Sequence, residues 1–169
     1  MAKRVFQAAT YTPTATADAS ALGSGTYQAI EASGATASMN VIEIYEGGQA
    51  GASSPCIMQF ARSLVFGVIP TALTTPNGDG PMNTATAALA AVPVTYVAAG
   101  TGPSRTNTGT TARLNLSFNA FGGIVRWVAA PGEEFGITGT SVSVSGATLS
   151  AFTGGTVGLM GSHIVYEPF

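Results

Sequence analysis

The segment RLNLSFNAF, residues 113–121, carries the clearest alternation of apolar and polar side chains in the chain. In an extended strand the two sets fall on opposite faces, because successive side chains point to opposite sides. The apolar set is Leu114, Leu116, Phe118 and Ala120, and the polar set is Arg113, Asn115, Ser117 and Asn119. We therefore predict a strand that covers a core on one side and meets solvent or a polar neighbour on the other.

The composition extends this prediction to the whole chain. The 169 residues include 22 glycines and are rich in Ala, Thr, Ser and Val, whereas the helix-favouring Lys, Glu, Gln and Leu are scarce. Turn-forming residues separate candidate strands roughly every 8–12 residues, which is typical of antiparallel sandwiches and barrels. We predict an all-β fold consisting of a single antiparallel β-sandwich.

Candidate strands precede and follow residues 113–121. They cover residues 39–46, 56–70 with a bend at Gly67, 92–98, two stretches around the Ala-Pro-Gly turn within 122–139, and 141–146, 147–152 and 162–169. A short helix over Ile57–Leu64 is an alternative for part of the second. The Asn-Gly and Asp-Gly pairs within residues 74–81 predict a tight turn, because such pairs supply positive φ angles.

Residues 1–35 differ in character from residues 36–169. They are rich in Thr, Ala, Ser and Gly, with one clear apolar cluster at Val5–Phe6 and with Pro13, which interrupts ladder pairing. We expect an extended N-terminal arm with a strand at each end, followed by the β-sandwich domain. A partly disordered tail is an alternative of about equal weight. The first residues carry no signal-peptide pattern, so synthesis in a cytoplasm is expected.

Charged side chains are few. Six basic and eight acidic residues leave a net charge of -2, and the mean hydropathy is +0.33. No apolar run approaches the roughly 18 residues of a membrane helix, so no membrane partner is expected. Low net charge favours association, which points to a subunit of an assembly. The basic residues are spread along a chain of pI about 5.2, so no nucleic acid is expected as a partner either.

The sequence marks out no catalytic, cofactor-binding or metal-binding set. The one histidine, His163, follows Ser162 in a predicted strand, where neighbours point apart and cannot form a dyad. The one cysteine, Cys56, opens an apolar segment, which indicates a buried and inert thiol. Glu133 and Glu134 are adjacent, which suits a solvated turn or an inter-subunit ion pair better than a glycosidase pair. We expect a protein that is not an enzyme.

The strand around Trp127 carries apolar side chains on both faces. One face holds Val125, Trp127 and Ala129, and the other face holds Ile124, Arg126 and Val128. A core strand is the favoured interpretation, because aromatic residues serve cores and interfaces alike. The alternative is a subunit interface on one face, in which Arg126 pairs with an acid such as Glu133 or Glu134.

Two segments resemble the small decoration, or cement, proteins of tailed-bacteriophage heads. They are GGIVRWVAAPGEEFGITG (Gly122–Gly139) and the closing GSHIVYEPF (Gly161–Phe169). The shared elements are a strand ending in Trp, a Pro-Gly turn with acids and a C-terminal strand holding Tyr-Glu. The resemblance implies a jelly-roll-like sandwich that trimerises on the outer capsid surface and clamps major capsid subunits, without catalytic residues.

The expected function is therefore that of a structural virion protein on the capsid surface, assembled in the host cytoplasm. Its expected partners are further copies of the chain, as a homotrimer, and the major capsid protein. The residues expected at interfaces are Val5, Phe6, Tyr11, Arg126, Trp127, Glu133 and Glu134. The alternative is a carbohydrate-binding, adhesin or tail-associated module, to which Tyr11, Tyr27, Tyr45 and Tyr96 could contribute.

Overall fold

The structure of the chain is a computed structural model that describes nine stretches. They are residues 5–11, 26–32, 38–63, 71–72, 79–81, 91–95, 112–138, 145–152 and 159–169. The described residues form twelve strands and no helix. Among them there is accordingly no helix with the length and apolar character to cross a membrane.

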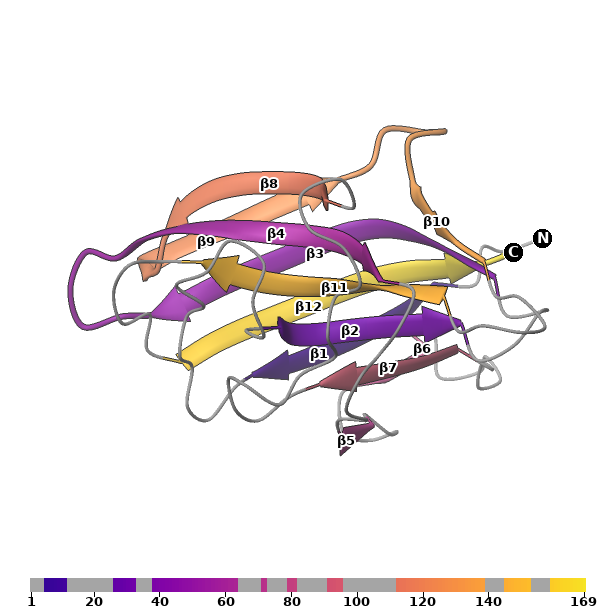
Figure 1. The fold of residues 1–169 in the computed structure, drawn as a ribbon, viewed down its shortest axis with the longest axis horizontal. Coiled ribbons are helices and arrows are strands. Elements are labelled where there is room, and N and C mark those ends of the chain that lie inside the picture. Colours follow the sequence, from indigo (N-terminus) through magenta and orange to yellow (C-terminus); the bar gives the residue numbers. More distant parts are fainter. Residues whose placement is uncertain are drawn as a thin grey trace.

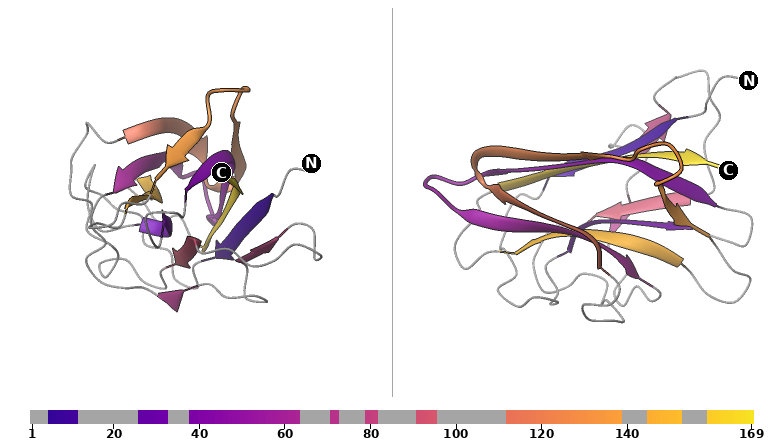
Figure 2. Two further views of the ribbon diagram at one scale, coloured as in Figure 1. Left: turned by 90° about the vertical axis from the view of Figure 1, so that its right-hand side faces the viewer. Right: turned by 90° about the horizontal axis from the view of Figure 1, so that it is seen from above.

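The strands form two six-stranded sheets that lie as two layers (Figure 1, Figure 2). Sheet A holds β1 (Phe6–Tyr11), β3 (Met39–Gln49), β6 (Asp79–Pro81), β9 (Phe121–Val128), β10 (Phe135–Ile137) and β12 (Leu159–Pro168). Sheet B holds β2 (Thr26–Ala32), β4 (Pro55–Ser63), β5 (Thr71–Ala72), β7 (Ala91–Thr95), β8 (Ala112–Asn119) and β11 (Ser145–Phe152). The fold is the predicted all-β antiparallel sandwich.

Four nested pairs of strands define how the chain is wound. β1 pairs with β12 and β3 with β9 in sheet A, whereas β2 pairs with β11 and β4 with β8 in sheet B, all antiparallel. The remaining contacts complete the orders β1-β12-β3-β9 and β2-β11-β4-β8. Among the described strands, the first therefore pairs with the last and the second with the one before it, and inside these pairs lie β3 with β9 and β4 with β8. This is the winding of a jelly roll.

The core lies between the two sheets. Its fully buried large side chains include Phe6, Ile44, Ile164 and Tyr166 from sheet A and Ile30, Met58, Phe60 and Leu149 from sheet B. Leu114, Leu116 and Phe118 of β8 pack against this cluster, while Arg113, Asn115, Ser117 and Asn119 are exposed. The alternation predicted for β8 is confirmed.

Other local predictions are settled by the hydrogen-bond ladders. Pro55–Ser63 is a strand between β8 and β11, so the helical alternative over Ile57–Leu64 is wrong for its described part. Asp79 and Gly80 belong to β6, which pairs with β1, so the turn expected within residues 74–81 does not reach them. In both cases a neighbouring strand distant in sequence supplies the partners, and tertiary pairing outweighs local preference.

The strands expected at the two ends of residues 1–35 are present. β1 lies between β12 and β6, and β2 lies between β11 and β7. Both are built into the sheets, and Phe6 and Ile30 enter the core. The rest of the expected arm, residues 1–4, 12–25 and 33–35, lies outside the described residues.

A tight corner joins the sheets where β3 leads to β4 and β8 leads to β9. Asn119 is its centre, because its Oδ1 accepts hydrogen bonds from the backbone N–H groups of Ser54 (2.9 Å) and Phe121 (3.0 Å). Its Nδ2 donates to Ser53 Oγ at 2.9 Å. Two glycines allow the chains to meet here, since a Cβ on Gly48 or Gly123 would lie 2.6 Å from Ala120 Cβ or 2.0 Å from Asn119 O.

Candidate functional site

The face of sheet A that points away from sheet B carries a row of side chains in register across four strands. His163 of β12 stands opposite Ala9 of β1 on one side and Tyr45 of β3 on the other, and Tyr45 stands opposite Arg126 of β9. Directly opposed residues share a face of the sheet. We call this surface the outer face of sheet A.

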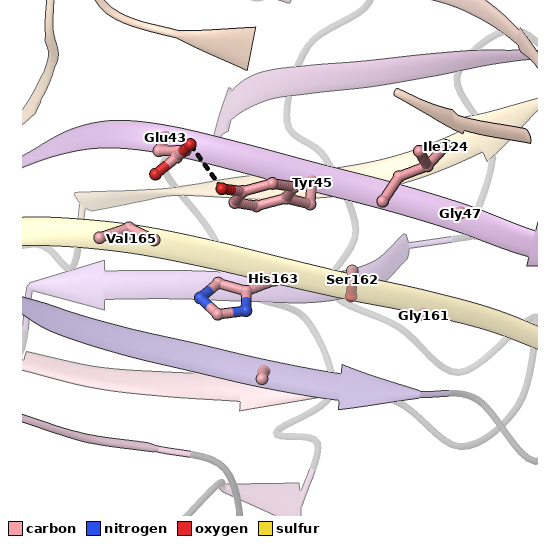
Figure 3. A pocket seen from close by; sticks show the side chains of 9 residues that line it. Glu43, Tyr45, Gly47, Ile124, Gly161, Ser162, His163 and Val165 are labelled. Carbon is pink, nitrogen blue, oxygen red and sulfur yellow. Dashed lines mark hydrogen bonds between the residues drawn. The ribbon is translucent and has the colours of Figure 1, made fainter. Parts of the chain in front are cut away.

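A hollow of about 480 Å³ opens on the outer face (Figure 3). Its floor includes Gly47 and Gly161, which are paired in register, and Ile124 stands beside Gly47 on β9. Gly161 is exposed, and a Cβ built on it would meet nothing within 4 Å. The remaining lining residues are Ala9, Glu43, Tyr45, Ser162, His163 and Val165. The hollow therefore exists partly because two neighbouring positions lack side chains.

One carboxylate gathers the polar groups at the side of the hollow. The hydroxyl of Tyr45 donates to Glu43 Oε1 at 2.6 Å. Arg126 Nε donates to the same oxygen, and its Nη2 completes an ion pair with it. The guanidinium carbon also lies 5.2 Å from the centroid of the Tyr45 ring, a cation–π geometry.

Within the chain, the acid that pairs with Arg126 is Glu43, 83 residues away in sequence. The alternative pairing of Arg126 with Glu133 or Glu134 across a subunit interface stays a prediction. In the antiparallel register Tyr45 stands opposite Arg126 and Glu43 opposite Val128, so Glu43 is a diagonal neighbour of Arg126. Only strand pairing could have identified this partner.

The contacts set the protonation of the three groups. Burial raises the pKa of Glu43, but the hydrogen bonds from Tyr45 and Arg126 and the charge of Arg126 outweigh it, so the net pKa lies below its usual value. The hydrogen bond to Glu43 raises the pKa of Tyr45, and the same carboxylate raises the pKa of Arg126. At neutral pH the network is therefore an ionised pair joined by a neutral phenol.

His163 forms the opposite side of the row. Its ring meets Tyr45 edge-on, with 5.4 Å between the centroids, and its Nε2 is buried without a hydrogen-bond partner among the described residues. Burial lowers the pKa of His163, and the charge of Glu43 offsets part of that effect. As predicted, its neighbour Ser162 points the other way and is buried. The imidazole is therefore neutral at pH 7.

Apolar side chains continue from the hollow along β9. Phe121, Ile124 and Val128 are 57%, 69% and 53% exposed. A bulge between Gly47 and Gln49 places Phe121 opposite Gln49, so Phe121 shares the outer face although its position has the opposite parity to that of Ile124. We call Phe121, Ile124 and Val128 the β9 stripe. Because Ile124 also lines the hollow, the stripe and the hollow form one continuous surface.

The residues expected at interfaces are divided between core and surface. Phe6 is 1% exposed and stacks on Tyr166 with centroids 5.7 Å apart. Trp127 points inward and stacks on Phe135 at 4.5 Å. Both side chains are therefore engaged within the monomer, in agreement with the core interpretation of the Trp127 strand.

The other expected residues lie toward the surface. Val5 is half-buried, Arg126 and Glu133 are exposed, and Glu134 accepts a hydrogen bond from the Gly132 N–H at 3.1 Å. Tyr11 is described only in its backbone, which pairs with Gly161. The sequence pattern placed Ile124 and Val128 on one face with Arg126 as a possible subunit interface, but no residue of the β9 stripe was among the residues expected at interfaces. Glu43 carried no signal at all.

The His, Cys, Asp and Glu side chains are the groups that could supply catalytic or metal-binding chemistry. Among the described residues, no three His, Cys, Asp or Glu side chains gather as a metal site would require. Cys56 is buried as predicted, and its Sγ donates to Ser54 O at 3.1 Å. The chemistry that the outer face offers is apolar contact, flanked by a closed ion pair.

No family model matches the chain, and its comparison with curated proteins and with solved structures produced no match. What the protein does therefore has to follow from its fold and from the outer face of sheet A.

Proposed function

We propose that the protein is a structural subunit that works by binding other proteins. Specifically, we propose a virion protein that decorates a bacteriophage head. In this role it binds the outer capsid surface and bridges major capsid subunits, which stabilises the shell. The proposal also includes association of the chain with itself, for which the sequence resemblance implies a trimer.

The observation that carries the proposal is the β9 stripe. Three large apolar side chains stand more than half exposed on one strand of a chain with only 14 charged residues, the sum of 6 basic and 8 acidic ones. Contiguous exposed apolar surface marks interaction sites on folded proteins. Interface centres favour aromatic and large apolar residues and arginine, and the stripe supplies these around Arg126.

Binding to shells tests the proposal directly. The purified protein is mixed with expanded, undecorated phage capsids, and bound copies are counted after sedimentation. We expect saturable binding at a fixed number of copies per shell and a higher temperature of capsid disruption. Failure to bind, or binding without stabilisation, would contradict the decoration role.

Sugar binding is a second candidate because Tyr45 lines the hollow beside a carboxylate. Aromatic rings and acidic groups are common in sugar sites. Here, however, Arg126 lies over the Tyr45 ring, and Tyr45 and Arg126 both donate hydrogen bonds to Glu43. A glycan screen read by the fluorescence of Trp127 distinguishes the two functions, and binding that is lost in Tyr45→Ala would favour this one.

A further inference from the structure

The outer face of sheet A carries both a projecting ring and a hollow. We propose that this face is a two-fold interface between two copies of the chain, in which Phe121 of each copy enters the hollow of the other. The inference deepens the proposed function and rests on its claim that the protein is an assembly subunit, but it names a different symmetry from the expected trimer.

The projecting part is Phe121. It is 57% exposed, and the bulge opposite Gly48 turns it onto the outer face. It stands opposite Gln49, two residues along β3 from Gly47 and the floor of the hollow, which is a spacing of roughly 7 Å in a strand. The ring and the hollow are therefore close neighbours on one surface.

The receiving part is the hollow, whose volume of about 480 Å³ is of the size that holds small ring-containing groups. Its floor is the backbone of Gly47 and Gly161, and its walls include Ile124, Tyr45 and His163. A phenyl ring entering it would lie on the backbone that the two glycines leave uncovered and would pack against Ile124, Tyr45 and His163. Buried aromatic anchors of this kind dominate the binding energy of interfaces.

A second copy is the occupant that this arrangement fits. A two-fold contact is self-complementary, because the same patch serves on both sides. With the axis lying in the contact plane between the ring and the hollow, each ring falls over the other copy's hollow, and Ile124 lies near the axis against its counterpart. In a closed trimer, each copy would contact two different neighbours through two different patches. The Phe121 side chain and the hollow would then have to lie on different faces of the molecule.

Charge does not oppose the contact. Glu43 and Arg126 neutralise each other within each copy, and His163 is held neutral by its burial. The chain as a whole has a net charge of only -2, so two copies repel each other weakly. The apolar residues of the β9 stripe then lose their water without a charged group being buried alone.

Filling the hollow is the sharpest test. Gly161→Val adds a side chain where a Cβ meets nothing within 4 Å, so it blocks the hollow without disturbing the monomer. Phe121→Ser removes the projecting ring. The matched control is Ile57→Ser, which removes another exposed apolar side chain, 45% exposed on β4 of sheet B. The mass of each protein is measured by light scattering and sedimentation across a concentration series.

We expect a wild-type dimer, dissociation constants raised at least tenfold in Gly161→Val and Phe121→Ser, and no change in Ile57→Ser. The melting temperature of monomeric Gly161→Val, taken at low concentration, should be unchanged or higher, because valine suits a strand better than glycine does. A wild-type monomer or trimer, or a dimer that both blocking variants preserve, would overturn the inference. So would equal dissociation of the control.

Capsid binding separates this inference from the proposed function. A wild-type monomer or trimer that still binds expanded capsids overturns the two-fold contact and leaves decoration standing. A dimer that dissociates in the blocking variants but binds no capsid supports the contact and counts against decoration.

Discussion

Arg126 lies over the ring of Tyr45, and both side chains donate to the same oxygen of Glu43. The hydrogen-bonding groups of these three residues on the outer face of sheet A are thus directed toward one another. The neighbouring residues of the β9 stripe remain exposed to solvent. A surface whose charges are paired internally and whose apolar groups are free suits protein contact better than recognition of a polar ligand.

The Glu43 network should make stability sensitive to acid. The pKa of Glu43 is lowered in the folded chain, so the contribution of its carboxylate is present above its usual value of 4.5 and is lost as the pH falls through the folded pKa. We expect the free energy of unfolding of Glu43→Gln to be lower than that of wild type at pH 7, and the difference to shrink toward pH 3. Urea titrations at several pH values measure it, with Glu133→Gln as the exposed control. A difference that does not shrink would rule out the linkage.

His163 should add a second and separate pH dependence. Because burial lowers its pKa below the usual 6.5, the unfolded chain binds the proton first as the pH falls. The contribution of the neutral His163 to the free energy of unfolding is therefore fully present above pH 6.5, and it decreases as the pH falls from there to the pKa of the folded chain. His163→Phe keeps an aromatic ring beside Tyr45 and removes the titration. As this is the one histidine of the chain, the slope between pH 6.5 and the acid range should vanish in the variant, and its persistence would contradict the assignment.

Side-chain periodicity predicted the fold better than it predicted the site. The regular alternation of residues 113–121 identified β8 and the side of it that faces the core. β3 was recognised as a strand, but the alternation of Ile42 and Ile44 did not hold, because β12 pairs past Ile42 through a bulge between Val165 and Tyr166. Ile42 is half-buried while Ile44 is fully buried. A bulge shifts the face of every residue beyond it, and its position depends on the partner strand.

The site could not be predicted from the sequence because its residues come together only through the pairing of distant strands. Glu43 and Arg126 are 83 residues apart and meet only through the register of β3 with β9. Likewise, Gly47 and Gly161 become the floor of one hollow only because β3 and β12 are adjacent. Isolated in the sequence, each of these glycines resembles a turn residue.

Asn119 should be the most costly exposed polar residue to replace in β8. Its amide holds two backbone N–H groups and Ser53, so Asn119→Ala leaves several groups of the corner without partners. We expect a loss of about 2 kcal/mol in the free energy of unfolding. Asn115→Ala on the same strand, which removes one hydrogen bond from Gln59, is the control and should cost about 0.5 kcal/mol. Equal losses in chemical denaturation would show that the corner does not depend on Asn119.

Gly123 should tolerate no side chain at all. A Cβ there would lie 2.0 Å from the backbone oxygen of Asn119, and a backbone atom cannot move aside as a side chain does. Gly123→Ala should therefore lose about 3 kcal/mol or more, or shift the β8–β9 connection. Gly51→Ala, where a Cβ meets nothing within 4 Å, is the matched control and should lie within about 0.5 kcal/mol of wild type. Thermal unfolding measures the melting temperatures of the two variants. Equal melting temperatures would contradict the prediction.

Replacing Phe6 tests whether its side chain serves the core, where the structure places it, or an interface, where the sequence analysis expected it. Its ring is fully buried against Tyr166, so Phe6→Ala should lower the free energy of unfolding by about 3–5 kcal/mol through the lost burial and the cavity left behind. Phe169→Ala removes a phenyl group that is 66% exposed and should cost about 0.5 kcal/mol or less. Denaturant unfolding at a concentration where the protein is monomeric measures both. If Phe6→Ala left monomer stability intact and changed only the mass of the assembly, the side chain would belong to an interface and β1 would not be a core strand of the sandwich.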